Sequence, residues 1–238
     1  MCDSYLRDFR SQSFDAMSLT PIGLANRASD EGLVIHTLPG GEAGMTGFKS
    51  QLRLRGDFEI SIGYEIRECS LPPEASGYGP TIYLFTRPPR AAAQLGRICR
   101  ADGRHVFTAY TAIPDDDRSV KSIRRFPAGS RHGRLRLRRQ GTTLLFQTSD
   151  SPHDASYQSL LQTEFVTEDV LMWRVAVAGS EPSVSATVVI TDLAVSATEI
   201  VPSEQTRRHE VMNLRWGIVR AILVSGALGL WLVRRRRH

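Results

Sequence analysis

Three carboxylates in the stretch RGDFEISIGYEIR, residues 55–67, come nearest to a spacing that could support hydrolytic chemistry. Cleavage of a glycosidic bond uses two carboxyl groups about 5–9 Å apart. On an extended strand, at about 3.4 Å per residue, Asp57 and Glu59 would lie on one side about 7 Å apart, and Glu65 about 20 Å further along. Carboxylates are common on strand surfaces, so we expect a solvated or salt-bridged face, and the sequence predicts no catalytic residue.

A dense group of basic side chains follows, with no acid among residues 118–139. It comprises Arg118, Lys121, Arg124, Arg125, Arg131, Arg134, Arg136, Arg138 and Arg139. A glycan or another anionic polymer would be recognised by such guanidinium groups, and the candidate binding residues are Arg124, Arg125, Arg134, Arg136 and Arg138. The alternative is a charged outer face whose arginines pair with acids of a neighbouring strand, such as Asp57, Glu59 and Glu65.

The sequence gives weaker evidence for a metal site or for redox chemistry. The run Asp115, Asp116, Asp117 offers hard oxygen ligands that suit Ca²⁺, but it lacks the spacing of a dedicated calcium loop. No other cofactor is predicted, because the histidines show no metal-ligand or catalytic spacing. Three cysteines with no Cys-x-x-Cys pair do not form a disulfide framework, and the sequence leaves a Cys69–Cys99 bridge open.

The elements that would position these side chains are strands. Apolar residues occupy every even position from Phe58 to Ile66, with polar residues or glycine between them, which is the period of a strand with one buried face. Gln140-Gly141 predicts the tight turn of a hairpin, and Arg55-Gly56-Asp57 is interpreted as a strand start and not as an adhesion loop. Strands are predicted at 33–38, 48–54, 57–67, 81–87, 93–100, 105–112, 134–139, 142–148, 170–178 and 185–199. Short strands separated by turn residues, without an amphipathic helix, predict an all-β sandwich or barrel.

The C-terminal segment predicts a membrane anchor. Residues 216–233 form an 18-residue apolar run interrupted only by Arg220, long enough to span about 27 Å. Residues 201–213 would then be a linker, residues 214–233 a transmembrane helix, and residues 234–238 a basic cytoplasmic tail. The anchoring residues would be Trp216 and Trp231 at the two interfaces, Arg220, and the cluster Arg234, Arg235, Arg236 and Arg237.

Charge and topology constrain the partners of the body. Residues 203–238 carry eight Arg and two Glu, a net charge of +6, so residues 1–202 carry −1 of the total +5. This balance argues against a nucleic-acid partner. The basic tail favours a non-cytoplasmic body, although the N-terminus MCDSYLRDFRSQSFDAM has no apolar export region; a cytosolic body with an inserted tail is the alternative.

Several segments resemble the concanavalin A-like lectin/glucanase superfamily, which includes laminin G-like domains. They are LRGDFEISIGYEI, GRLRLRRQGTTLLFQTS, VLMWRVAVAG and ATVVITDLAVSATEI, within a likeness that covers about residues 5–200 and is greatest to bacterial domains of unknown function. The resemblance implies a jelly-roll β-sandwich of two antiparallel sheets over residues 1–200. It also implies that a glucanase would carry a Glu-x-Asp-x-x-Glu strand, a pattern that this sequence lacks.

These observations together predict a non-catalytic, membrane-anchored recognition or assembly module. Its partner would be a glycan, an anionic polymer of the cell envelope, or another protein. A glycan-active hydrolase with an atypical site and a purely structural interaction domain are the alternatives.

Overall fold

A computed structural model describes residues 2–11, 18–23, 26–37, 45–70, 77–87, 90–115, 118–151, 156–178 and 185–203. Every regular secondary-structure element within these ranges is a β-strand. The chain divides after Val201 into two compact units, and the fold described below is that of the first. The predicted transmembrane helix and basic tail lie outside the described residues, within which no helix is long and apolar enough to span a bilayer.

The described part of the chain contains sixteen strands. They are β1 (Asp3–Asp8), β2 (Leu19–Ile22), β3 (Asn26–Ser29), β4 (Gly32–Thr37), β5 (Met45–Ser50), β6 (Leu52–Cys69), β7 (Gly77–Tyr78), β8 (Pro80–Thr86), β9 (Ala92–Arg100), β10 (His105–Asp115), β11 (Arg118–Pro127), β12 (His132–Gln140), β13 (Thr143–Ser149), β14 (Gln158–Glu164), β15 (Val170–Ala178) and β16 (Ala186–Pro202).

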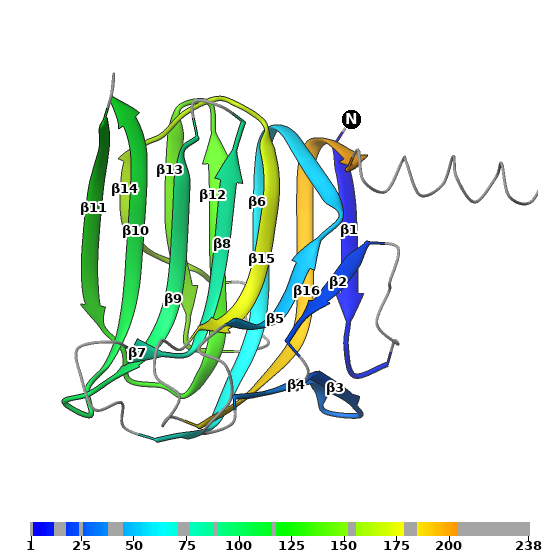
Figure 1. Cartoon of the computed structure of the whole chain (residues 1–238), viewed down its shortest axis with the longest axis vertical. Coiled ribbons are helices and arrows are strands. Elements are labelled where there is room, and N and C mark those ends of the chain that lie inside the picture. Colours follow the sequence, from blue (N-terminus) through cyan, green and yellow to red (C-terminus); the bar gives the residue numbers. More distant parts are fainter. Residues whose placement is uncertain are drawn as a thin grey trace, which may run out of the picture. The chain divides into compact units, whose positions relative to one another are not determined.

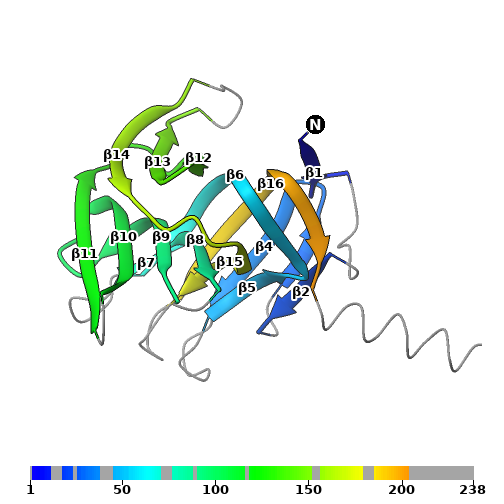
Figure 2. The same ribbon diagram turned by 90° about the horizontal axis from the view of Figure 1, so that it is seen from above.

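Hydrogen bonds join these strands into one antiparallel sheet that folds over into two layers (Figures 1 and 2). Layer A has the order β2-β5-β15-β8-β9-β10-β11, with β7 paired to β9. Layer B has the order β14-β13-β12-β6-β16; β16 also pairs with β1 and β4, and β4 pairs with β3. The residue pair Val170–Leu54 links β15 to β6 and so connects the layers. The all-β prediction is confirmed, and the two layers are consistent with the predicted jelly roll.

The core lies between the layers, and the alternation read from the sequence places it there. Phe58, Ile60, Ile62, Tyr64 and Ile66 of β6 are all buried. They share one hydrophobic cluster with layer A residues that include Ile82, Leu84, Leu95, Phe107 and Trp173. Full burial of one such side chain stabilises the fold by about 1.5–3 kcal/mol. The strands of both layers must therefore keep their apolar residues on the side that faces the core.

Two local expectations need correction. The strand predicted at 48–54 is divided, because Gln51 separates β5 from β6 and the chain passes there from layer A to layer B. Gly56 lies inside β6, not at a strand start, with a φ of 66°. A Cβ at Gly56 would lie 2.6 Å from Thr198 Oγ1, so the position favours glycine. The predicted turn glycine, Gly141, is confirmed with a φ of 57°.

Candidate functional site

The predicted arginines of β12 are paired with acids of their own layer. Arg134 donates through Nη1 and Nη2 to the two carboxylate oxygens of Asp192, at 3.1 and 2.5 Å, and through Nε to the Tyr157 hydroxyl at 3.0 Å. Burial by itself would lower the pKa of Arg134, but these partners outweigh it and the pKa is raised. The guanidinium group is therefore held charged and occupied within the protein.

Arg136 and Arg138 share a second acid. Arg136 donates to Gln147 Oε1 at 2.8 Å, lies 3.4 Å from Glu59 Oε1, and stacks 3.6 Å from the centre of the Tyr157 ring. Arg138 lies 3.9 Å from the other oxygen of Glu59. This arrangement is the paired outer face that the sequence offered as the alternative to a ligand patch.

The other acids of the opening stretch also have structural partners. The Asp57 carboxylate accepts a hydrogen bond of 2.7 Å from the backbone N–H of Gly141, which ties the β12–β13 turn to β6. Glu65 lies 3.5 Å from Arg67. Asp57, Glu59 and Glu65 are therefore dispersed along β6, as expected for a salt-bridged face.

Arg124 and Arg125 lie elsewhere, on β11 at the edge of layer A. Both are exposed, and they project to opposite faces, because Arg124 pairs in register with core-facing Ala109 and Arg125 with outward-facing Thr108. The structure therefore does not bring the five predicted arginines together: three lie on layer B and two on layer A.

The acidic run predicted for Ca²⁺ is only partly described. Asp115 ends β10 opposite Arg118, whereas Asp116 and Asp117 lie outside the described residues. Within the described ranges no three His, Cys, Asp or Glu side chains gather as metal ligands would. All three cysteines are free, and burial, together with the neighbouring Cys99 thiol, raises the pKa of Cys69 to about 12.

Charge is divided unequally between the layers. The strands of layer B carry nine acidic and nine basic residues. In the described strands of layer A, Asp115 is the sole acid. The basic residues of layer A are Lys49, Arg97, Arg100, Arg118, Lys121, Arg124, Arg125 and Arg174. The near-neutral body therefore has one strongly basic layer.

Strand register aligns the outward side chains of layer A in rows that cross the sheet. One row is Thr20, Lys49, Arg174, Tyr83, Gln94, Tyr110 and Ile123, from β2 to β11. The adjacent row is Ile22, Gly47, Ala176, Thr81, Gly96, Thr108 and Arg125. The second row is made largely of small residues beside long ones, which leaves a trough perpendicular to the strands over β8–β11; farther along the row, Gly47 of β5 and Ala176 of β15 are buried.

A pocket of about 220 Å³ occupies the β8–β11 part of this trough. It is lined by Thr81, Tyr83, Gln94, Gly96, Ile98, Arg100, Val106, Thr108, Tyr110, Ile123 and Arg125. Hydroxyl, amide, guanidinium and aromatic groups therefore converge on one hollow. We call this pocket the layer A groove.

Arg174 borders the groove through Tyr83, a lining residue. Its guanidinium carbon lies 4.8 Å from the ring centre of Tyr83 and 5.3 Å from that of Phe85. Burial raises the pKa of Tyr83, so its hydroxyl stays protonated. Arg174 has no carboxylate partner among the described residues, and its Nε atom is buried without a hydrogen bond. A guanidinium group whose charge the described part of the chain leaves unbalanced therefore lies beside the groove.

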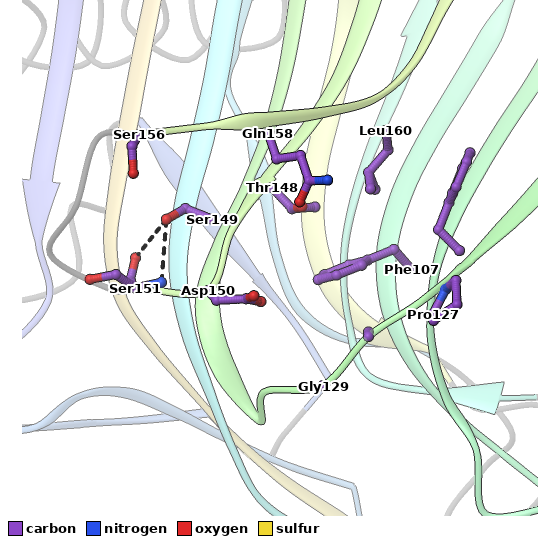
Figure 3. Close-up of a pocket in the computed structure, with 12 residues that line it drawn as sticks. Phe107, Pro127, Gly129, Thr148, Ser149, Asp150, Ser151, Ser156, Gln158 and Leu160 are labelled. Carbon is purple, nitrogen blue, oxygen red and sulfur yellow. Dashed lines mark hydrogen bonds between the residues drawn. The ribbon is translucent and has the colours of Figure 1, made fainter.

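A second hollow, of about 510 Å³, lies between the layers at the edge formed by β10, β11, β13 and β14. Phe107, Asp150 and Gln158 point into it from three different segments (Figure 3). Ser149 donates its hydroxyl to Ser151 O at 3.2 Å and accepts the Ser151 N–H at 3.3 Å, so that hydroxyl is already engaged. We call this hollow the interlayer cleft; Asp150 is its only carboxylate among the described lining residues.

Comparison with known proteins supports the fold. A family model described as "Protein of unknown function (DUF1583) C domain" matches residues 1–216. No curated protein matches the sequence.

Solved structures with the same fold share little sequence with this chain. A Crh5 transglycosylase in complex with NAG has a TM-score of 0.55 at 7% identity, covering 82% of this chain and 84% of its own. The CBM2 module of Lactobacillus casei BL23 phage J-1 evolved Dit has a TM-score of 0.55 at 10% identity, covering 82% and 96%. A legume lectin-like domain from Entamoeba histolytica has a TM-score of 0.50 at 9% identity, covering 79% and 91%. The predicted resemblance to concanavalin A-like lectin/glucanase folds is confirmed.

Proposed function

The chain belongs to the family described as "Protein of unknown function (DUF1583) C domain", and we propose that its body binds a carbohydrate chain in the layer A groove without cleaving it. The C-terminal segment at 214–233 would hold this recognition module at a membrane, with the body on the non-cytoplasmic side.

The observation that carries the proposal is the direction and chemistry of the groove. It crosses the strands in register, so a linear polymer can lie along a row and contact several strands in succession. Sugars are bound through hydrogen bonds to hydroxyl groups and apolar contact with ring faces. Gln94, Thr108 and Tyr110 supply both kinds of contact within one pocket. Two similar folds, a transglycosylase with bound NAG and a legume lectin-like domain, agree with a carbohydrate ligand.

We propose that the body does not cleave the carbohydrate because of where its acidic residues lie. Glycoside hydrolysis requires paired carboxyl groups beside the bound sugar. In the described strands of layer A the sole acid is Asp115, at the end of β10, and it does not line the pocket. The carboxylates of β6 lie on layer B, where Glu59 is engaged by Arg136 and Arg138 and Asp57 by the Gly141 N–H.

A steric block of the groove tests the binding site. The full-length protein would be screened against laminarin, chitin oligosaccharides, xylan, alginate, polygalacturonate and heparin, and its affinity for each bound glycan measured by calorimetry. Thr108→Trp places an indole in the row of small residues, and we expect affinity to fall at least about tenfold, equivalent to about 1.4 kcal/mol. Tyr110→Ala should act in the same direction by removing a ring and a hydroxyl group.

Gln158→Trp is the matched control, because it adds a large aromatic side chain to the interlayer cleft. Melting temperatures of all variants would establish that they fold. Binding that survives Thr108→Trp but is lost in Gln158→Trp would place the carbohydrate in the interlayer cleft and contradict the proposal.

A further inference from the structure

We propose that the carbohydrate bound by the layer A groove is anionic, carrying carboxylate or sulfate groups on some of its sugar units. This inference rests on the proposed function and names the ligand class of the same site.

Cations flank the groove on its β15 side and line it on its β11 side. Lys49 and Arg174 are neighbours in register on β5 and β15. Arg125, on β11, lines the far end of the pocket, and Arg100, on β9, lines it as well. Between Arg174 and Arg125 there are four strand spacings, or about 19 Å at about 4.8 Å per spacing. A polymer that spans the groove would therefore meet positive charge at two separate places.

The protein does not neutralise these charges itself. Within the described residues, Lys49, Arg125 and Arg174 have no ion-pair partner, whereas Arg100 lies 3.5 Å from Asp102. On layer B, by contrast, three arginines of β12 form ion pairs with Glu59 and Asp192. Unpaired cations on one face, with paired cations on the other, indicate that the first face meets an anion from outside.

The centre of the groove distinguishes a polysaccharide from a nucleic acid. Between the two charged ends the rows carry Thr81, Tyr83, Gln94, Gly96, Thr108 and Tyr110, which are all uncharged. A nucleic acid presents a phosphate at every nucleotide and is bound by a continuous positive groove. Widely spaced cations around a hydroxyl- and amide-rich centre instead suit a polymer with sparse charge and many hydroxyl groups.

The test compares a polymer with its own neutral derivative. Full-length protein would be titrated with polygalacturonate and with the same polymer after methyl esterification, and with alginate before and after carboxyl reduction. We expect the anionic form to bind more tightly in at least one pair. Arg125→Gln and Lys49→Gln should each weaken that binding by about two- to fivefold, the effect expected of an exposed ion pair. The affinity for the neutral derivative should fall less than the affinity for the anionic form.

Arg138→Gln is the matched control, since it removes the same charge from layer B and should change neither affinity. Equal binding of the charged and neutral forms, blocked by Thr108→Trp, would overturn this inference and leave carbohydrate binding in place. Binding to no polysaccharide would contradict the proposed function itself. Equal or tighter binding to a single-stranded DNA oligonucleotide, weakened by the same two variants, would show a nucleic-acid groove and would also overturn the inference.

Discussion

At the scale of single residues, neighbouring arginines of β12 have opposite roles. Arg138 is half-exposed and lies 3.9 Å from Glu59. Arg139 is buried: its Nη1 donates to Val166 O at 3.1 Å and Glu168 O at 2.7 Å, and its Nη2 donates to Gly56 O. Arg139 therefore holds the backbone that leads into β15 against the backbone of β6.

This difference predicts unequal stability effects from one substitution. Arg139→Leu leaves buried carbonyl groups without donors, and we expect a loss of about 3 kcal/mol in the free energy of unfolding. Arg138→Leu removes an exposed pair and should cost at most about 1 kcal/mol. Chemical denaturation of both variants would measure the difference. Similar losses would contradict the role given to Arg139.

At the scale of elements, the floor of the groove depends on a close cross-strand pair. Gly96 of β9 lies opposite Thr81 of β8, and a Cβ at Gly96 would be 2.5 Å from Thr81 Oγ1 and 3.3 Å from its Cβ. The missing side chain at Gly96 makes room for the threonine hydroxyl.

A double-mutant cycle tests this packing. Gly96→Ala should destabilise the protein by about 1–3 kcal/mol through overpacking. The same change in a Thr81→Ala background should cost clearly less, because the clashing hydroxyl is gone. The coupling would be read from thermal unfolding of the four proteins. Additive effects would show that the two side chains do not compete for the same space.

The sequence predicts the central strands well and the edges poorly, for a physical reason. Strand β6 alternates strictly because one of its faces is buried. Strand β11 has exposed residues along nearly all its length, and β14 is also largely exposed, so neither needs an alternating pattern and both were missed.

The candidate site could be predicted only in part from the sequence, for a related reason. The predicted binding residue Arg125 lines the groove, but Arg134 is paired with Asp192, 58 positions away. Alternation shows which face a side chain occupies, but not which strand lies beside it. The groove arises from the register of β8, β9, β10 and β11, and no local pattern encodes that register.

At the scale of the whole molecule, the partition of charge and acids predicts recognition without turnover. The basic layer carries the groove, and apart from Asp115 the acids of the described strands lie on the balanced layer. Incubation of the full-length protein with any glycan it binds should therefore release no new reducing ends above a protein-free blank. Release that tracks the purified protein and is lost in Thr108→Trp would indicate a hydrolase with an atypical site. Release lost only in an Asp150→Asn variant would place that activity in the interlayer cleft.

The most direct test of the central claim is hydroxyl-radical footprinting of the full-length protein with and without its bound glycan. Tyr110 and Ile123 line the groove of layer A, whereas Tyr157 lies beneath Arg136 on layer B. The account predicts that the glycan protects Tyr110 and Ile123 from oxidation and leaves Tyr157 unchanged. Protection of Tyr157 with no change at Tyr110 would place recognition on the other layer and contradict the account.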